Sequence, residues 1–452
     1  MSTEATPLLP TQTEQINLSL WCQLSEVISE AKILIKYGIP VLGAQILEYS
    51  LILVSAVSLG HVSTEALAAS SLSSITATVT GLSIVHGFAS ALDSLLPHAW
   101  TSDQPEKVGL WAQRMAVVMF INALPILAIW LNAESILLRL GQEENIARLA
   151  GLYLGWFSLS LPGLIVGVVT RRYLQAQGIM HAQTIVMAFI APANLFFNWL
   201  LVWGPPSFRL GFIGAPIASS ISFTLSAAIY VGYTYFFVSR KAWHPIGRQT
   251  IQGLGTLYRL GLSGTGQIAS EWWSWEFLGL MSSRFGATSL AAQSVLLVSA
   301  SVAFQTPYSL GVSVAVRVGN LLGSGDGRKA KIAAETAIGL SIIAALIMST
   351  VIMIVDGATA VTDGVLRATG RLGLGAMVNI TAYYCIGIPL GLYLAFWKGM
   401  ELKGLWIGIT AAIFYAASAS IYAVSRTVWR KEVENAVQRL KHGQEGQQAV
   451  EA

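Results

Sequence analysis

The chain is a succession of long apolar runs separated by short polar loops, and this feature limits its fold more than any other. A helix that crosses a membrane needs about 20 mostly apolar residues. Eleven runs of this kind are predicted to be membrane helices. They lie at residues 38–59, 66–92, 108–131, 149–170, 183–203, 211–238, 259–281, 290–316, 333–355, 374–397 and 404–425. The sequence therefore predicts an all-α integral membrane protein that is embedded in a lipid bilayer and has no soluble domain.

The composition excludes several other classes of protein. Hydrophobic residues make up 54% of the 452 residues and charged residues only 11%, whereas soluble proteins carry about 25% charged residues. This balance rules out a soluble enzyme, a disordered chain and a nucleic-acid binder. The two cysteines, Cys22 and Cys385, are too few for a disulfide framework or a thiolate metal cluster. We expect no catalytic activity, no metal and no cofactor.

The basic residues alternate between the loops and predict an orientation. Loops on the cytosolic side of a membrane carry an excess of lysine and arginine. All but six of the 27 lysines and arginines fall on one set of loops and tails. The six exceptions are Arg139, Arg148, Arg209, Arg284, Lys398 and Lys403. We therefore expect both termini to be cytosolic, with polar tails at residues 1–32 and 426–452.

The two halves of the chain resemble each other. Residues 38–48 match residues 261–271 at an offset of 223, which makes Glu48 the repeat partner of Glu271. Further on, Leu-Gln-Ala-Gln-Gly at 174–178 matches Leu-Arg-Ala-Thr-Gly at 366–370, at an offset of only 192. Between these two matches Gly87 pairs with Gly311 at an offset of 224, so the second half has lost about 32 residues. The missing piece corresponds roughly to the fourth helix of the first half, around residues 132–164.

The distribution of charge indicates the same defect. The basic loops 317–331 and 367–371 require two crossings between them, but only 35 residues are available. The fold class is therefore two parallel six-helix repeats that form two lobes, with about one helix missing from the second lobe. We assign the N-lobe to 33–238, a cytosolic linker to 239–256 and the C-lobe to 257–425. Lobes of this kind work in transporters by rocking about a central site.

Acidic residues inside predicted membrane helices are the main candidates for a functional site. A carboxylate at the centre of a membrane helix costs about 2.5–3.5 kcal/mol on insertion scales. Glu271 lies halfway along its run among three tryptophans, where loss of hydration favours the protonated acid. Such a group can hold a proton or pair with a cation, but not both at once. The alternative is a structural role, in which protonated Glu271 hydrogen-bonds to a neighbouring helix.

Other residues are weaker candidates for the same site. Asp356, Glu276 and Glu48 complete the predicted proton- and substrate-binding set, although each also has a structural interpretation. The aromatic residues Trp272, Trp275 and Tyr383 are candidates for stacking on flat cations. Packing or anchoring at the membrane interface is the alternative for these three side chains.

Several motifs together resemble the multidrug and toxic compound extrusion (MATE) family, in its eukaryotic branch, over residues 33–425. The matching stretches are Gly-Phe-Ala-Ser-Ala-Leu-Asp-Ser-Leu at 87–95, Glu-Trp-Trp-Ser-Trp-Glu at 271–276, Leu-Ala-Ala-Gln-Ser at 290–294, Val-Arg-Val-Gly-Asn at 316–320 and Gly-Val-Leu-Arg-Ala-Thr-Gly at 364–370. The resemblance implies twelve helices in two lobes and use of the acids at the Glu271 and Asp356 positions. The acid at Glu276 also matches. This sequence departs from the family pattern in one respect: most of the tenth helix is missing before Asp356. We interpret this loss as a defect of splicing or of the gene model.

The resemblance also implies a function. The expected activity is proton-coupled antiport that exports organic cations, drugs or secondary metabolites, by a monomer in the vacuolar or plasma membrane. One alternative is a flippase of the related lipid-linked-sugar group, which would need a strongly basic cavity. The other is a membrane receptor or scaffold that transports nothing.

Overall fold

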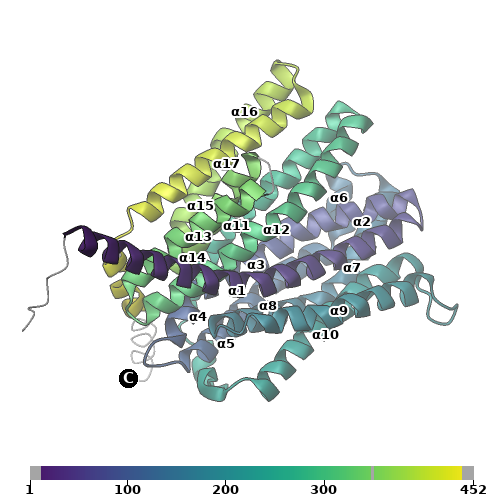
Figure 1. The fold of residues 1–452 in the computed structure, drawn as a ribbon. Coiled ribbons are helices and arrows are strands. Elements are labelled where there is room, and N and C mark those ends of the chain that lie inside the picture. Colours follow the sequence, from purple (N-terminus) through teal and green to yellow (C-terminus); the bar gives the residue numbers. More distant parts are fainter. Residues whose placement is uncertain (1–11, 348–350, 440–452) are drawn as a thin grey trace, which may run out of the picture.

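The computed structural model describes residues 12–347 and 351–439, and every regular element in that part of the chain is a helix. The all-α prediction is confirmed. Figure 1 shows the helices packed side by side, with the first half of the chain (purple to teal) beside the second half (green to yellow). Helices suit a bilayer because each satisfies its own backbone hydrogen bonds where water is absent.

The first half is built from helices that join into longer rods. They are α1 (Gln12–Gly60), α2 (Thr64–Ala77), η1 (Thr78–Leu82), α3 (Ser83–Ser90), α4 (Leu92–Trp100), α5 (Lys107–Leu131), α6 (Ala133–Arg139), α7 (Glu144–Phe157), η2 (Ser158–Ser160), α8 (Leu161–Ala176), α9 (His181–Asn198), η3 (Trp199–Trp203), η4 (Gly211–Ile213) and α10 (Gly214–Phe237). Two short helices follow in the connecting segment, η5 (Arg240–Ala242) and η6 (Arg248–Ile251).

The second half repeats this layout in a shorter form. Its helices are α11 (Leu254–Ser282), η7 (Ser283–Phe285), α12 (Ala287–Gly323), α13 (Gly327–Ile347), α14 (Val351–Ala368), α15 (Leu372–Ile380), η8 (Thr381–Gly387), α16 (Ile388–Leu392), η9 (Tyr393–Trp397) and α17 (Glu401–Ser425). Residues 429–439 form a further helical segment after α17.

Eight helical segments of the described chain are long and apolar enough to cross a membrane. Each of them overlaps one of the eleven runs predicted from the sequence. The runs at 259–281 and 290–316 also form helices, α11 and α12. The run at 333–355 does not form one helix, because α13 ends at Ile347 and residues 351–355 begin α14. The α11 helix carries Glu271 and Glu276 and is therefore more polar than a typical span. The chain is thus an integral membrane protein.

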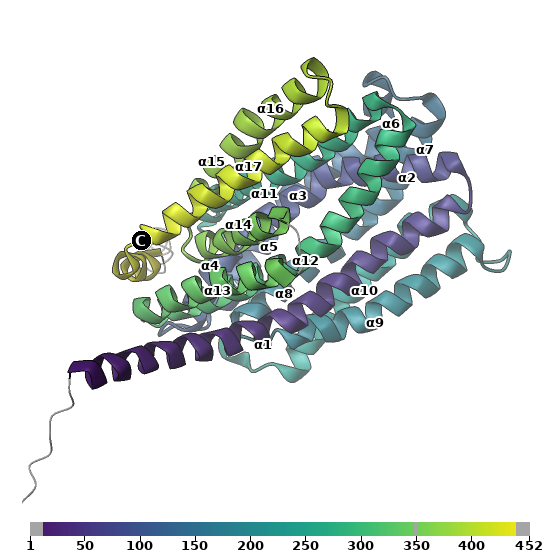
Figure 2. The same cartoon turned by 45° about the horizontal axis from the view of Figure 1, so that its top comes forward.

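The shortened part of the second half consists of two helices, α13 and α14. The α13 helix has 21 residues and α14 has 18, and the two pack against each other (Figure 2). At the offset of 192, α14 corresponds to α8, which belongs to the fourth span of the first half. The sequence placed the loss around the positions of residues 132–164, and α14 is the helix that remains after it. Residues 348–350, between α13 and α14, lie outside the described residues.

The two halves touch closely where glycines replace side chains. A Cβ on Gly87 of α3 would collide with the Thr265 backbone of α11, and a Cβ on Gly264 would collide with the Gly87 carbonyl oxygen. Pro97 of α4 likewise lies against Gly319 of α12. Glycine permits this approach because it has no Cβ, as at other tight contacts between membrane helices.

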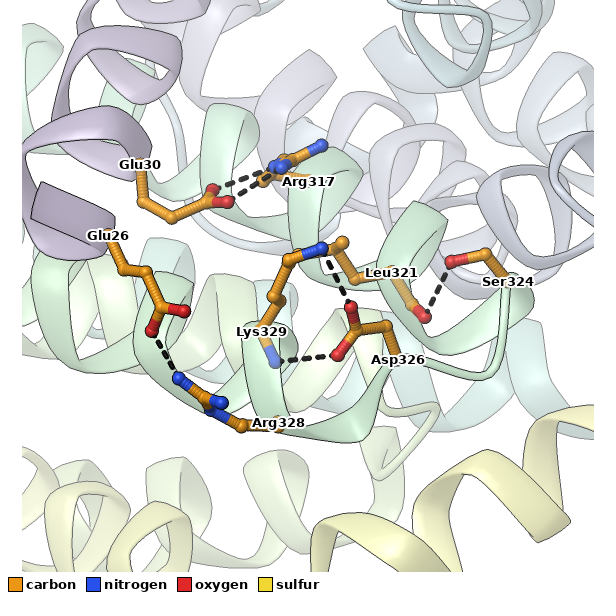
Figure 3. Close-up of polar contacts among 8 residues, drawn as sticks. All are labelled: Glu26, Glu30, Arg317, Leu321, Ser324, Asp326, Arg328 and Lys329. Atoms are coloured by element: carbon orange, nitrogen blue, oxygen red, sulfur yellow. Dashed lines mark hydrogen bonds and ion pairs between the residues drawn. The ribbon is translucent and has the colours of Figure 1, made fainter. Parts of the chain in front are cut away.

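The start of α1 differs from the sequence prediction, which assigned residues 1–32 to a tail. The chain is helical from Gln12, and Glu30 is buried against the second half. The Glu30 carboxylate accepts hydrogen bonds from Arg317 Nε at 2.8 Å and from Arg317 Nη2 at 2.6 Å. Figure 3 shows this pair beside a second one, in which Arg328 Nη2 donates to Glu26 Oε2 at 2.5 Å. The first helix of one half is therefore tied to α12 and α13 of the other.

Candidate functional site

Two acids that the sequence singled out lie close together in the second half. Glu271 occupies the middle of α11, and Asp356 lies near the start of α14. Asp356 is buried and Glu271 is half-buried. The two carboxyl groups interact electrostatically, and Glu271 also interacts with Arg367 of α14. Glu271 therefore faces the interior of the second half rather than the surrounding lipid.

A third acid, Asp363, belongs to the same group and was missed in the sequence analysis. It follows Asp356 by seven residues, which is close to two helical turns and puts both carboxyl groups on one face of α14. Asp363 is buried and interacts electrostatically with both Glu271 and Asp356. The spacing of seven residues between two acids on an apolar helix was the available signal.

Neutral polar side chains surround these acids. Asn379 of α15 donates from Nδ2 to the Gln267 carbonyl oxygen at 3.2 Å and to Asp363 Oδ2 at 3.5 Å. The Gln267 side chain of α11 lies beside Asp363. Tyr383 of η8 is fully buried and interacts electrostatically with Glu271, Asp356 and Asp363. The predicted aromatic residue Tyr383 therefore lies beside the acids.

One arginine connects the acidic group to the first half of the chain. Arg367 Nε lies 3.4 Å from Asp93 Oδ2 of α4, and Arg172 Nε of α8 lies 2.9 Å from Asp93 Oδ1. Arg367 also interacts with Glu271 and Asp363. Asp93 is thus held by one arginine from each half, and Arg367 is shared between this contact and the acidic group.

Glu48, the repeat partner of Glu271, lies in a different electrostatic setting. Arg171 Nη1 of α8 donates to Glu48 Oε2 at 2.7 Å, and the Arg171 side chain is buried. His86 of α3 and Arg172 also lie within electrostatic range of Glu48. The acid of the first half is therefore neutralised by an arginine, whereas Glu271 lies among further acids. A role for Glu48 in binding stays a prediction.

The remaining predicted residues extend along α11 in different directions. The Trp272 ring lies 5.6 Å from the His86 ring of α3, measured between ring centroids, and so faces the first half. The Trp275 ring lies 5.9 Å from the Trp406 ring of α17, inside the second half. Glu276 is half-buried and forms no ion pair with a described residue. The structure does not bring these three side chains together with Asp356.

The acidic group has the chemistry of a site for protons or organic cations. Among the described residues, this group has one nearby arginine for three carboxyl groups, together with a tyrosine and two amides. Ionisation of all three carboxyl groups would therefore leave excess negative charge. Burial of a negative carboxylate away from water is costly unless it binds a proton or pairs with a cation. Among the described residues, no three His, Cys, Asp or Glu side chains converge as they would around a metal ion.

Comparison with known proteins gives a consistent result. The MatE family model matches residues 40–200 and 266–358. The chain is 33% identical to an uncharacterized transporter of Schizosaccharomyces pombe, over 93% of this chain and 83% of the relative. It is 30% identical to Multidrug and toxin extrusion protein 1 of Danio rerio, over 90% and 74% of the two chains.

Solved structures agree with these matches. The crystal structure of the eukaryotic MATE transporter AtDTX14 superposes with a TM-score of 0.85 at 29% identity, over 92% of this chain and 99% of that one. A Vibrio cholerae MATE transporter in its bent form has a TM-score of 0.75 at 18% identity, over 91% and 99%, and supports the fold alone.

Proposed function

The chain belongs to the MATE family, and from that premise we propose that it is a proton-coupled antiporter that exports organic cations, drugs or secondary metabolites. MATE transporters carry small organic substrates across a membrane and are not a class of enzymes. The proposal for this chain adds the charge of the substrate, the coupling ion and the residues that bind both.

The group of acids in the second half is the observation that carries the proposal. Asp356 is buried, Glu271 is half-buried, and their carboxyl groups interact electrostatically. A buried carboxyl group is stable when protonated or when paired with a cation, and unstable when neither is present. Proton release therefore creates the binding site for a cationic substrate, and reprotonation displaces that substrate.

The other predicted residues have supporting roles in this proposal. Tyr383 borders the acids and offers a ring and a hydroxyl group to an organic cation. Trp272 and Trp275 follow Glu271 along α11, and Trp272 lies at the contact with the first half. Glu276 and Glu48 are secondary binding residues. The charge of Glu48 is already compensated by Arg171 in this structure.

Alternating access requires the lobes to separate at one end of the molecule at a time. In this structure Glu30 pairs with Arg317 (Figure 3), and Asp93 pairs with Arg367, so ion pairs join the two halves toward the end rich in basic residues. We assign this end to the cytosol because basic residues accumulate there. The same proposal puts both termini in the cytosol and a monomer in the vacuolar or plasma membrane.

Transport in proteoliposomes tests the function. Purified protein is reconstituted in vesicles with an imposed pH gradient, and ethidium, a fluorescent organic cation, reports movement of the substrate. The wild type is expected to move ethidium only while the gradient lasts. Glu271→Gln keeps the shape of the side chain but cannot release a proton, so the initial rate should fall at least about tenfold, equivalent to about 1.4 kcal/mol.

A matched control separates this effect from general damage. Glu335→Gln removes an acid from an exposed position on α13, where the carboxylate is 62% exposed. This variant should transport ethidium at the wild-type rate. Undiminished gradient-driven transport by Glu271→Gln would contradict the role of Glu271 in proton coupling.

The same assay separates the two alternative functions. A lipid-linked-sugar flippase needs a basic cavity to hold phosphates, whereas the group of residues described above is acidic. A receptor or scaffold should show no ethidium flux under any pH gradient. Flux of a fluorescent lipid-linked sugar without flux of ethidium would favour the flippase.

A further inference from the structure

Asp363 occupies the position at which the first half of the chain has an arginine. The offset of 192 that relates α8 to α14 pairs Arg171 with Asp363. The offset of 223 that relates α1 to α11 pairs Glu48 with Glu271. In the first half, Arg171 neutralises Glu48 at 2.7 Å. In the second half, the equivalent pair is two acids, so the charge at the position of Arg171 is reversed at Asp363.

Asp363 has an incomplete set of hydrogen bonds, because Oδ2 accepts one long bond from Asn379 Nδ2 at 3.5 Å and Oδ1 accepts none from a described residue. Asp363 Oδ1 and Asn379 Oδ1 are buried acceptors, and neither has a hydrogen-bond partner among the described residues. The Gln267 side chain is 1% exposed, and its amide oxygen and nitrogen also lack a hydrogen bond of good geometry to any described residue. A protonated Asp363 would supply the missing donor, because its O–H group can donate to either amide oxygen.

The charged groups around Asp363 come from several helices. Arg367 lies on its own helix, and Asp356 and Glu271 add negative charge from α14 and α11. Tyr383 of η8 faces the same group, and Asp93 of α4 competes for Arg367 at 3.4 Å. Among the described residues of α12, α13, α15 and α17, which also pack on α14, none has a charged interaction with Asp363.

We propose that Asp363 is a third proton-exchanging carboxyl group of the transport site, additional to Glu271 and Asp356. This inference rests on the proposed function and deepens it. When an organic cation enters, the Asp363 O–H bond breaks and its proton passes to water on the side to which the site is open. The remaining carboxylate is neutralised by the positive charge of the substrate. When the substrate leaves on the other side, a proton from the water there restores the acid. The number of protons exchanged per transported cation is therefore larger by one than it would be without Asp363.

Infrared spectroscopy tests the exchange of this proton without any substrate. Difference spectra of the purified full-length protein between acidic and alkaline pH contain the carbonyl band of every carboxylic acid that loses its proton. Asp363→Asn should reduce this band by the share of one carboxyl group, and Asp363→Glu should restore it. Glu335→Gln removes an exposed acid of α13 that lies outside this group of acids, and it serves as the matched control. An unchanged band in Asp363→Asn would overturn the proposal.

The ratio of protons to ethidium tests the same carboxyl group during transport. The ratio is obtained from the ethidium gradient that just balances an imposed pH gradient across proteoliposomes. Asp363→Asn should still transport, with one proton fewer per ethidium than the wild type. An equal ratio in the two proteins would refute the role of Asp363 and leave proton coupling intact. Absence of pH-driven flux in the wild type would refute the proposed function, and the infrared band would then decide on Asp363 alone.

Discussion

At the scale of residues, Glu48 and Arg171 give a prediction about stability. The pair is largely buried, with 8% of the Arg171 side chain exposed and 25% of the Glu48 side chain. Removing one member of a buried ion pair leaves the other charge without compensation, which costs about 3–5 kcal/mol. Glu48→Gln should therefore lower the free energy of unfolding by about this amount, measured by thermal or denaturant unfolding in detergent.

The double variant Glu48→Gln with Arg171→Met is the matched control for that prediction. It removes both charges, so it should recover most of the stability lost in Glu48→Gln. If the double variant also transports ethidium, Glu48 has a structural role. Loss of transport in a stable double variant would instead favour a direct part in binding.

Sequence reasoning found only part of the acidic group, for physical reasons. Glu271 and Asp356 were detectable because an acid within an apolar run is rare and costly. Asp363 was passed over because it lies close to the basic loop at 367–371, where an acid is not unusual. Gln267 and Asn379 were missed because neutral amides on a membrane helix carry little signal, and only the fold brings them to Asp363.

At the scale of elements, Asp326 caps the start of α13. Its Oδ1 accepts a hydrogen bond from the Lys329 backbone N–H at 2.9 Å, as is typical of an acid at the start of a helix (Figure 3). This hydrogen bond, followed by the Lys329 side chain, lowers the pKa of Asp326 below its usual value. A carboxyl group with a lowered pKa stabilises the folded state above its unfolded pKa of about 3.9, and the effect is lost as the pH falls through the folded value.

We therefore expect Asp326→Asn to loosen the first turn of α13 at neutral pH only. The asparagine retains a capping oxygen but has no charge. Backbone amides of residues 327–331 should exchange hydrogen faster in the variant than in the wild type at pH 7, and equally fast once the pH is below the lowered pKa of Asp326. Mass spectrometry of the exchanged peptides measures this difference. A difference that persists at the lowest pH would show that the charge of Asp326 is not its cause.

The shortened helix pair shows what a sequence repeat can and cannot predict about an element. The two offsets identified both the region of the loss and its size. They did not show where the retained helices begin and end, because the single apolar run at 333–355 is divided in the structure between α13 and α14. The structure retains α14, the part that carries Asp356, Asp363 and Arg367. The charged residues of α14 are therefore present although α13 and α14 are together shorter than the matching part of the first half.

At the scale of the whole molecule, the sequence repeat predicts two lobes that rock against each other. The structure adds the contacts that must break. Thr101 Oγ1, just after α4, donates to the Asn320 carbonyl oxygen of α12 at 2.7 Å, and Gly319 and Gly323 bring the same helices together. If the lobes separate at this end during each cycle, a covalent link across α4 and α12 must stop transport.

This expectation can be tested with cysteines at both positions. Thr101→Cys and Asn320→Cys are combined in a protein whose Cys22 and Cys385 are replaced by serine, and a short, reducible bifunctional thiol reagent joins them. Digestion and mass spectrometry verify the link. Ethidium transport should fall to background after linking and return on reduction, while each single-cysteine variant keeps its activity with the reagent present. Transport at the original rate by fully linked protein would mean that this end never opens, and the substrate would then have to cross by a path other than the separation of the lobes.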